Sequence, residues 1–371
     1  MNKLFALFFV IIIVISSPAR VSAADSLAED YGADSLIDNL PEDTRKSLSD
    51  IGLGEFNINA LNELSFEKIL NGIISSAGEE GKTPLRTLAV IIALLLLYSL
   101  LYGLRSSVSN TSLQQVLSIC VTLCVTAALV VPIITVINSG IEAIKTASDF
   151  MLAYIPVMLV VMTASGKAVS GASYYTLMMF AGQAVTQISS AFIAPFLKLF
   201  LGLSVSSAVS PNINLNGLVR FISKLIKWAL GFIMCLFTGV LTLRQIVSSG
   251  LDSVGTRAVK FTLSSLVPVV GSALSEAYRT VQSSVGLLRS GVGVFALIAV
   301  MAVFMPVIIK CLWWLLILWV SRSAGELMGL KEPCFLLESL SGVIGNIFAI
   351  ILCVSAVFII STASVLILGG G

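Results

Sequence analysis

The segment LAVIIALLLLYSLLYGL, residues 88–104, contains no charged residue and is long enough to cross the hydrocarbon core of a bilayer as a helix. Similar apolar runs recur to the end of the chain, and they are continuous rather than alternating in short segments. The 371 residues are 57% hydrophobic and 11% charged, whereas a soluble domain has roughly 25% charged residues. Because so few charges cannot cover a soluble core, the sequence predicts an all-α, polytopic helical membrane protein rather than a β-barrel.

The apolar runs predict about seven or eight transmembrane helices in a membrane domain over residues 88–371. Residues 173–208 are too long for one straight span, since 36 residues would extend roughly 54 Å against a hydrocarbon core of about 30 Å. Break points at 187–190 and at Pro195 favour two short helices or a re-entrant pair there. A short loop carrying Glu142, Lys145 and Asp149 is expected between the second and third spans. The predicted spans lie near 88–104, 115–137, 150–165, 173–208 (broken or double), 226–246, 292–320 and 343–368.

Residues 1–23 have the pattern of a cleavable secretory signal peptide. Lys3 supplies the basic amino-terminal part, residues 4–15 the apolar core, and Val21-Ser22-Ala23 a small-residue cleavage site. An uncleaved first anchor is the other open interpretation. Cleavage would leave the mature amino terminus on the extracytoplasmic side of the membrane.

Residues 24–87 form an acidic region that looks soluble, with thirteen acids and five bases, so its net charge is 5 − 13 = −8. Pro41-Glu42-Asp43 predicts the start of a helix, with Pro and acids in its first turn. Apolar residues between Leu64 and Ile74 recur at helical spacing and predict an amphipathic helix that ends near Gly78. About sixty residues with so few large apolar side chains are marginal alone. The region either packs on a partner or the membrane surface, or is a solvated spacer.

The orientation of the spans follows from Lys and Arg in short loops. With the exported amino end outside, Arg105 and Lys167 are expected on the cytoplasmic side, together with Arg322 and Lys331. The basic residues on the two sides of the 226–246 span balance. The sequence therefore does not decide whether 261–290 crosses the membrane or lies along its surface, although both versions place the carboxyl end outside.

The stretch VPVVGSALSEAYRTVQSSVGLLRS, residues 267–290, carries a polar face within an otherwise apolar neighbourhood. An unpaired charge at mid-depth in a bilayer costs about 2.5–3.5 kcal/mol, so this face requires water or opposite charge. A solvated interfacial helix, a pore or cavity lining and a partner-docking helix all stay open. Lys310 interrupts a second apolar run, where snorkelling to the interface and a role in conduction are the alternatives. The candidate pore-lining or helix-pairing residues are Glu276, Arg279, Ser272, Ser275, Gln282 and Lys310.

The chain has no histidine, which removes the commonest general base and metal ligand. GxxxxGK[ST] and GxSxG patterns are absent, and no pair of acids is placed at mid-membrane depth. Five of the six cysteines lie within apolar runs, where they pack as small apolar residues. We therefore expect no catalytic, cofactor or metal site and no enzymatic activity. A basic, aromatic nucleic-acid surface is also lacking.

Three stretches resemble the stage III sporulation protein AE family of endospore-forming bacteria. They are LNELSFEKILNGI at 61–73, SLVPVVGSALSEAYRTVQSSVGLLRSGVGVFALIAV at 265–300, and MPVIIKCLWW at 305–314. With the signal sequence, the acidic region and the polytopic body, the resemblance covers nearly the whole chain. It includes no known site motif, so no functional residue is carried over.

The resemblance implies an integral membrane component of the channel or secretion complex that joins mother cell and forespore and is required for late forespore development. The protein would lie in the mother-cell membrane around the forespore, as a homo-oligomer surrounded by lipid. Its implied partners are the other proteins of the stage III sporulation A operon and, across the intermembrane space, the forespore's stage II protein Q. The alternatives are a stand-alone secondary transporter for a small solute, or a non-conducting assembly scaffold.

Overall fold

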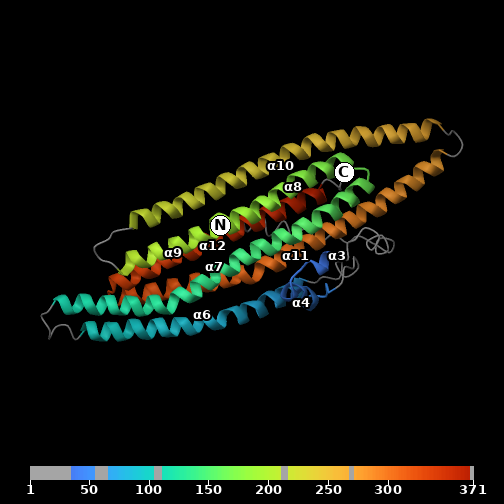
Figure 1. The fold of residues 1–371 in the computed structure, drawn as a ribbon. Helices are drawn as coiled ribbons and strands as arrows, with labels where there is room; N and C mark the ends of the chain where they lie inside the picture. The colour runs from blue at the N-terminus through green and yellow to red at the C-terminus, as the bar shows by residue number, and fades with distance from the viewer. Residues whose placement is uncertain (1–34, 55–65, 104–110, 210–215, 267–270, 368–371) are drawn as a thin grey trace.

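The computed structural model describes residues 35–54, 66–103, 111–209, 216–266 and 271–367, and all regular elements within these ranges are helices. The predicted signal peptide and its cleavage site lie outside the described residues. Two short helices come first, and long helices follow (Figure 1). They are α3 (Ser35–Asp38), α4 (Glu42–Asp50), α6 (Phe66–Gly103), α7 (Thr111–Ala164), α8 (Ala168–Ile188), the π-helix η2 (Ser189–Ile193), α9 (Ala194–Val209), α10 (Asn216–Leu266), α11 (Gly271–Leu327) and α12 (Lys331–Ile367).

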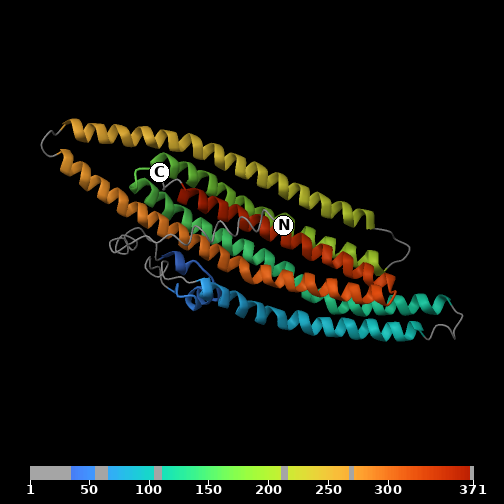
Figure 2. The same ribbon diagram turned by 180° about the vertical axis from the view of Figure 1, so that it is seen from behind.

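The long helices form an elongated bundle of antiparallel passes, in which α8, η2 and α9 together make one pass (Figures 1 and 2). Within the described residues, six helical segments are long and apolar enough to cross a membrane. The predicted all-α, polytopic fold is confirmed, and six is close to the expected seven or eight. Because the passes alternate, α6 begins at the end of the bundle where α12 finishes.

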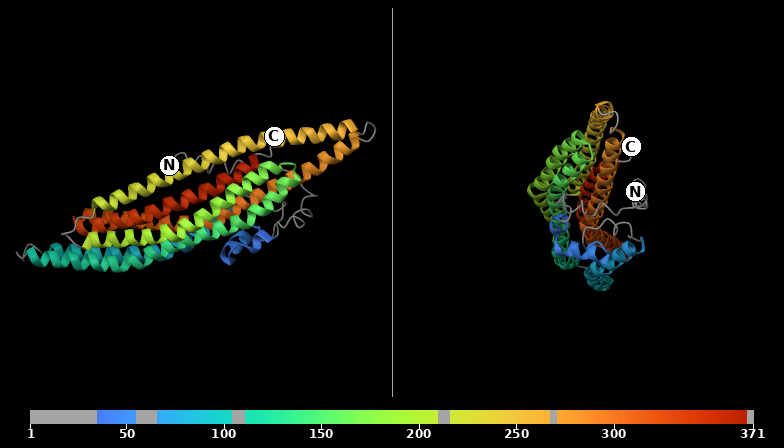
Figure 3. Two further views of the ribbon diagram at one scale, coloured as in Figure 1. Left: turned by 45° about the horizontal axis from the view of Figure 1, so that its top comes forward. Right: turned by 90° about the vertical axis from the view of Figure 1, so that its right-hand side faces the viewer.

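The central helix of the bundle is α12. It packs against α11, α7, α9 and α10, and the end-on view in Figure 3 places it inside the others. The apolar window of each long helix is an 18-residue apolar stretch within it. In α12, 61% of this window is buried within the protein, and in α11 67% is buried. In contrast, α10 lies along one edge of the bundle, and only 6% of its apolar window is buried. The apolar core therefore lies around the α11–α12 hairpin.

The loop expected at 138–149 is wrong, because α7 continues as one helix of 54 residues, about 81 Å long. Glu142, Lys145 and Asp149 are exposed on its outer side, and charged residues of this kind are compatible with a helix interior. A helix that crosses once separates the residues before it from those after it. The shared cytoplasmic placement of Arg105 and Lys167 relied on a loop within this stretch, and the side on which each residue lies stays a prediction.

The expected break near 187–190 is present, but it is not a chain reversal. The five-residue π-helix η2 joins α8 to α9 end to end, so the re-entrant pair is wrong. Pro195 explains the wider turn, since its ring has no N–H and would clash with the carbonyl group four residues earlier in a regular α-helix. A π-turn at this point lets the helix continue.

At the amino-terminal side, α4 begins after Pro41 as expected. The predicted end of a helix near Gly78 is wrong, because α6 continues through Gly78 and Pro84 to Gly103. The amphipathic part of the acidic region and the first apolar span are therefore one helix. Trp313 of α11 packs on this helix near Gly81, where it holds the continuation in place.

The segment 261–290 is not a single helix, because α10 ends at Leu266 and α11 begins at Gly271. Between these helices lies Pro268, outside the described residues. Gly293 of α11 packs against Leu366, near the end of α12. The twenty-two residues of α11 before Gly293 therefore extend about 33 Å beyond α12, beside the end of α10 (Figure 1).

Candidate functional site

Lys310, the one predicted site residue whose side chain the structure describes, lies where α11 meets α6. Its Nζ atom is 3.2 Å from Oε2 of Glu80. One turn away, Trp313 Nε1 donates a hydrogen bond to the carbonyl oxygen of Ala77 at 2.9 Å. A Cβ atom at Gly81 would lie 2.9 Å from the Trp313 ring, so a small residue is needed there. The acid that pairs with Lys310 thus belongs to the acidic region 24–87, which the sequence analysis separates from the membrane domain.

The other five candidates, at 272, 275, 276, 279 and 282, belong to the first turns of α11. These turns lie in the part of α11 that extends beyond α12, next to the end of α10 (Figure 1). Their side chains lie outside the described part of the chain. The pore-lining role of these residues stays a prediction, and the structure places them far along the bundle from Lys310.

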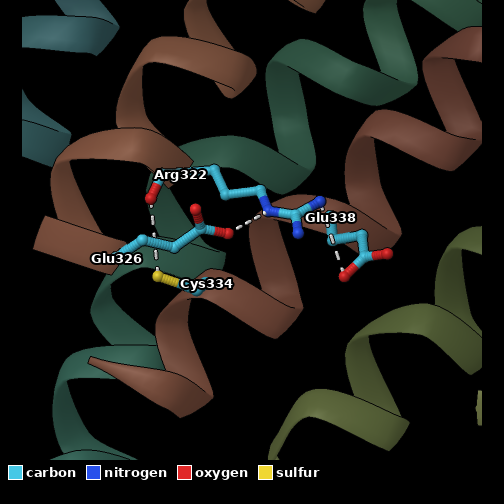
Figure 4. Close-up of polar contacts among 4 residues, drawn as sticks. All are labelled: Arg322, Glu326, Cys334 and Glu338. Carbon is cyan, nitrogen blue, oxygen red and sulfur yellow. Dashed lines mark hydrogen bonds and ion pairs between the residues drawn. The ribbon is translucent and has the colours of Figure 1, made fainter. Parts of the chain in front are cut away.

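At the opposite end of the bundle, a charged cluster joins α11 to α12 beside their connecting turn (Figure 4). Arg322 Nε donates to Glu326 Oε1 at 2.7 Å, and Arg322 Nη1 lies 3.5 Å from Glu338 Oε2. The thiol of Cys334 donates to the carbonyl oxygen of Arg322 at 3.5 Å. Gly325 leaves the room for this sulfur, since a Cβ atom there would lie 2.6 Å from it. The cluster fixes the α11–α12 turn and is only partly buried.

A third polar site connects α10 to the start of α8. The buried carboxylate of Asp252 accepts hydrogen bonds from the backbone N–H groups of Val169 and Ser170, at 2.9 and 2.8 Å. These are among the free N–H groups of the first turn of α8, so Asp252 caps that helix from a distant part of the chain. Beside it, burial lowers the pKa of Lys167; the charge of Arg289 lowers it further, whereas Asp252 raises it.

Arg289 of α11 is buried next to this cap, with 2% of its surface exposed. Among the described residues its Nε atom has no hydrogen-bond partner, and the side chain of Tyr154 lies within electrostatic range of the guanidinium group. On the same side of the core, the hydroxyl of Ser361 lies 3.4 Å from that of Tyr174. Polar groups from α7, α8, α10, α11 and α12 therefore gather at this end of the bundle.

Sequence reasoning did not single out Asp252, Arg289 or Glu80 as site residues. A signal was available for the first, because Asp252 is the lone acid among the 51 residues of α10. Arg289 lies at the end of the stretch that was selected for Glu276. The partner of Lys310 could not be found by spacing, since Glu80 is 230 residues away.

The polar sites hold ion pairs, a helix cap and hydrogen bonds between helices. Within the described residues, no three metal-ligating side chains come together. Comparison with known proteins identifies the family to which the chain belongs. The family model described as stage III sporulation protein AE matches residues 54–369. The chain belongs to this family.

A curated relative, the stage III sporulation protein AE of Bacillus subtilis (strain 168), is 26% identical over 233 residues. The matched region covers 63% of this chain and 58% of the relative, so it spans a little more than half of the relative's length. No solved structure matches the chain. Family membership makes this a sporulation protein, and its helices are those of a multi-pass membrane protein.

Proposed function

We propose that this protein is an integral membrane component of the complex that links mother cell and forespore, and that late forespore development requires it. The observation that carries the proposal is the family match over 54–369, on a chain with six apolar passes. The charged groups described above support a membrane location, because those inside the bundle are paired or gathered with other polar groups. Its proposed place is the mother-cell membrane that surrounds the forespore.

The proposed orientation puts the acidic residues 24–65 in the intermembrane space, where α6 begins. Their charge suits contact with basic surfaces of other exported proteins. The proposed partners are the other proteins of the stage III sporulation A operon, further copies of this chain and, indirectly, the forespore's stage II protein Q. The projecting ends of α10 and α11 lie on this side as well.

The test is deletion of the gene in its own host, followed by complementation. We expect few heat-resistant spores and loss of a late forespore reporter, with both restored by the wild-type gene. A tagged copy should stay in membranes washed at alkaline pH and should co-purify with products of the same operon. Normal spore numbers in the deletion strain would contradict the proposal.

A stand-alone secondary transporter is a second candidate, and the π-helix η2 favours it. Interrupted helices with irregular backbone line the solute sites of many transporters, and π-turns frequently lie at functional sites. Solute uptake by the purified protein alone in liposomes would favour the transporter. Absence of uptake together with a sporulation defect would favour a component of the complex, either conducting or a scaffold.

A further inference from the structure

Arg289 of α11 is a buried cation for which the described part of the chain supplies no counter-charge. Only 2% of its surface is exposed, and its Nε atom has no hydrogen-bond partner within that part. No acid among the described residues lies within 4.0 Å of its guanidinium group. A buried charge is costly unless it is paired and hydrogen-bonded. A negative group from elsewhere is therefore needed to balance Arg289.

Two acids lie closest to Arg289 in the fold or along α11, and neither pairs with it. Asp252 accepts hydrogen bonds from the backbone N–H groups of α8 through both of its carboxylate oxygens. Its charge acts on Lys167, whereas the group that acts on Arg289 is Tyr154. Glu276 lies thirteen residues before Arg289 on the same helix. That spacing is about 20 Å along the helix axis, which is too far for a direct ion pair.

The surroundings of Arg289 offer further groups that attract anions. Lys167, the residue before α8, is close enough for the charge of Arg289 to act on it. In the first turn of α8, the hydroxyl group of Ser170 is buried and has no hydrogen-bond partner among the residues that the structure describes. With Asp252, the two cations give a net charge of 2 − 1 = +1. The positive end of the α8 dipole adds to this charge.

The donors favour an anion with oxygen atoms. A guanidinium group presents parallel N–H donors that match two oxygens of a carboxylate or a phosphate, and a net charge of +1 is balanced by one negative charge. We propose that Arg289, Lys167 and the Ser170 hydroxyl group bind a monovalent oxyanion between α11 and the first turn of α8. A small free carboxylate and the phosphodiester of a membrane lipid share this chemistry. The site is a property of the chain itself and does not depend on the proposed function.

Thermal unfolding of the purified full-length protein tests the site. In neutral detergent, sodium acetate is titrated against a bulky sulfonate at equal ionic strength. In a second arm, phosphatidylglycerol replaces phosphatidylcholine in lipid nanodiscs. We expect the unfolding midpoint of the wild type to rise by on the order of a few degrees, because a ligand that binds only the folded state stabilises it. A rise with acetate identifies a free carboxylate, and a rise with phosphatidylglycerol alone identifies the lipid.

Variants of two arginines on α11 connect this response to the site. Arg289→Gln should abolish the rise and, in sulfonate, should unfold at no lower temperature than the wild type, since a buried charge without a partner is removed. Arg322→Gln is the matched control, because Arg322 is paired with Glu326 and Glu338, and it should keep the full response. Arg289→Lys keeps the charge but loses the parallel donors, so we expect the anion to bind about tenfold more weakly.

Three results would overturn the inference. The first is a wild-type midpoint that responds to neither acetate nor phosphatidylglycerol, and the second is an equal rise in Arg289→Gln. The third is a large loss of stability of Arg289→Gln in sulfonate, since Arg289 would then have its partner within the protein. All readings are made on the purified protein whatever the spore count is, so this proposal and the proposed function fail separately.

Discussion

The central helix α12 and the peripheral helix α10 are both apolar and long enough to cross a membrane, yet they are held in opposite ways. The apolar window of α12 is 61% buried by other helices, whereas that of α10 is 6% buried. Trp228 and Phe232 of α10 stack on each other at 5.6 Å between ring centroids, and both are exposed. In water such a helix would expose a large apolar patch. Lipid removes that penalty, so burial by protein is not what holds α10.

Polar contacts attach α10 to the bundle instead. Near its start, Asn346 Nδ2 of α12 donates to Ser223 Oγ at 3.0 Å. Farther along, Arg244 Nη1 donates to the carbonyl oxygen of Ser173 at 3.3 Å, and Asp252 caps α8. The comparison teaches that a larger side chain should destabilise the packing around α12. The removal of a single hydrogen-bonding group should instead weaken the attachment of α10.

The largest contrast is expected from glycines. Gly140 packs against α12, and a Cβ atom there would lie 2.9 Å from Ile347 Cγ1. Within the part of the chain that the structure describes, Gly231 of α10 has no such neighbour within 4 Å. We expect Gly140→Leu to lower the free energy of unfolding by about 1–3 kcal/mol through overpacking, and Gly231→Leu to leave it nearly unchanged. Thermal unfolding of the purified proteins in detergent measures both, and equal losses would break the comparison.

Hydropathy alone could predict the class of this fold and most of the passes, because each pass contains a continuous apolar run. It failed on α7, where Glu142, Lys145 and Asp149 looked like a loop. A charge pattern does not tell a loop from a helix that turns its charges outward. The continuity of α6 through Gly78 was missed for a related reason, since glycine and proline mark helix ends less strictly where a neighbour such as Trp313 supports the helix.

The polar sites were less predictable than the passes. Lys310 was found because a charge in an apolar run is conspicuous, but its partner comes from a distant helix. Asp252 contacts the first turn of α8, and Arg289 lies near Tyr154 on the buried side of α7. Their roles therefore depend on neighbours that are distant in the sequence. The polar face at 267–290 drew attention by its composition, whereas the role of Glu80 became visible only once the packing of α6 on α11 was known.

The second prediction concerns the attachment of α10. Asp252→Ala removes the acceptor for two N–H groups of α8, and we expect a loss of about 0.5–2 kcal/mol, as for other helix caps. Asp149→Ala is the matched control, because Asp149 is an exposed acid without a described partner. Limited proteolysis and thermal unfolding should show α10 released earlier in the first variant only. If both variants behave like the wild type, the cap does not hold α10.

The third prediction addresses α6, whose apolar window is 22% buried, between the two extremes. Trp313→Phe keeps most of the ring but removes the hydrogen bond to Ala77, so we expect a loss of about 0.5–1.5 kcal/mol. Trp319→Phe is the control, because Trp319 is 67% exposed. Indole fluorescence during unfolding follows both variants. An equal or larger loss for Trp319→Phe would mean that the hydrogen bond from Trp313 to Ala77 does not hold α6.

The smallest effect is expected for the Lys310–Glu80 pair, and it decides whether α6 is also attached by charge. The side chains are 23% and 26% exposed, so the pair is partly screened, and a coupling energy of about 0.2–1 kcal/mol is the range for such pairs. Lys310→Gln, Glu80→Gln and the double variant form a double-mutant cycle for the free energy of unfolding. We expect the losses of the two single variants to add up to more than the loss of the double variant, because each single variant leaves one charge unpaired near hydrocarbon. Additive losses would mean that water already screens both groups, so that the pair does not attach α6 to α11.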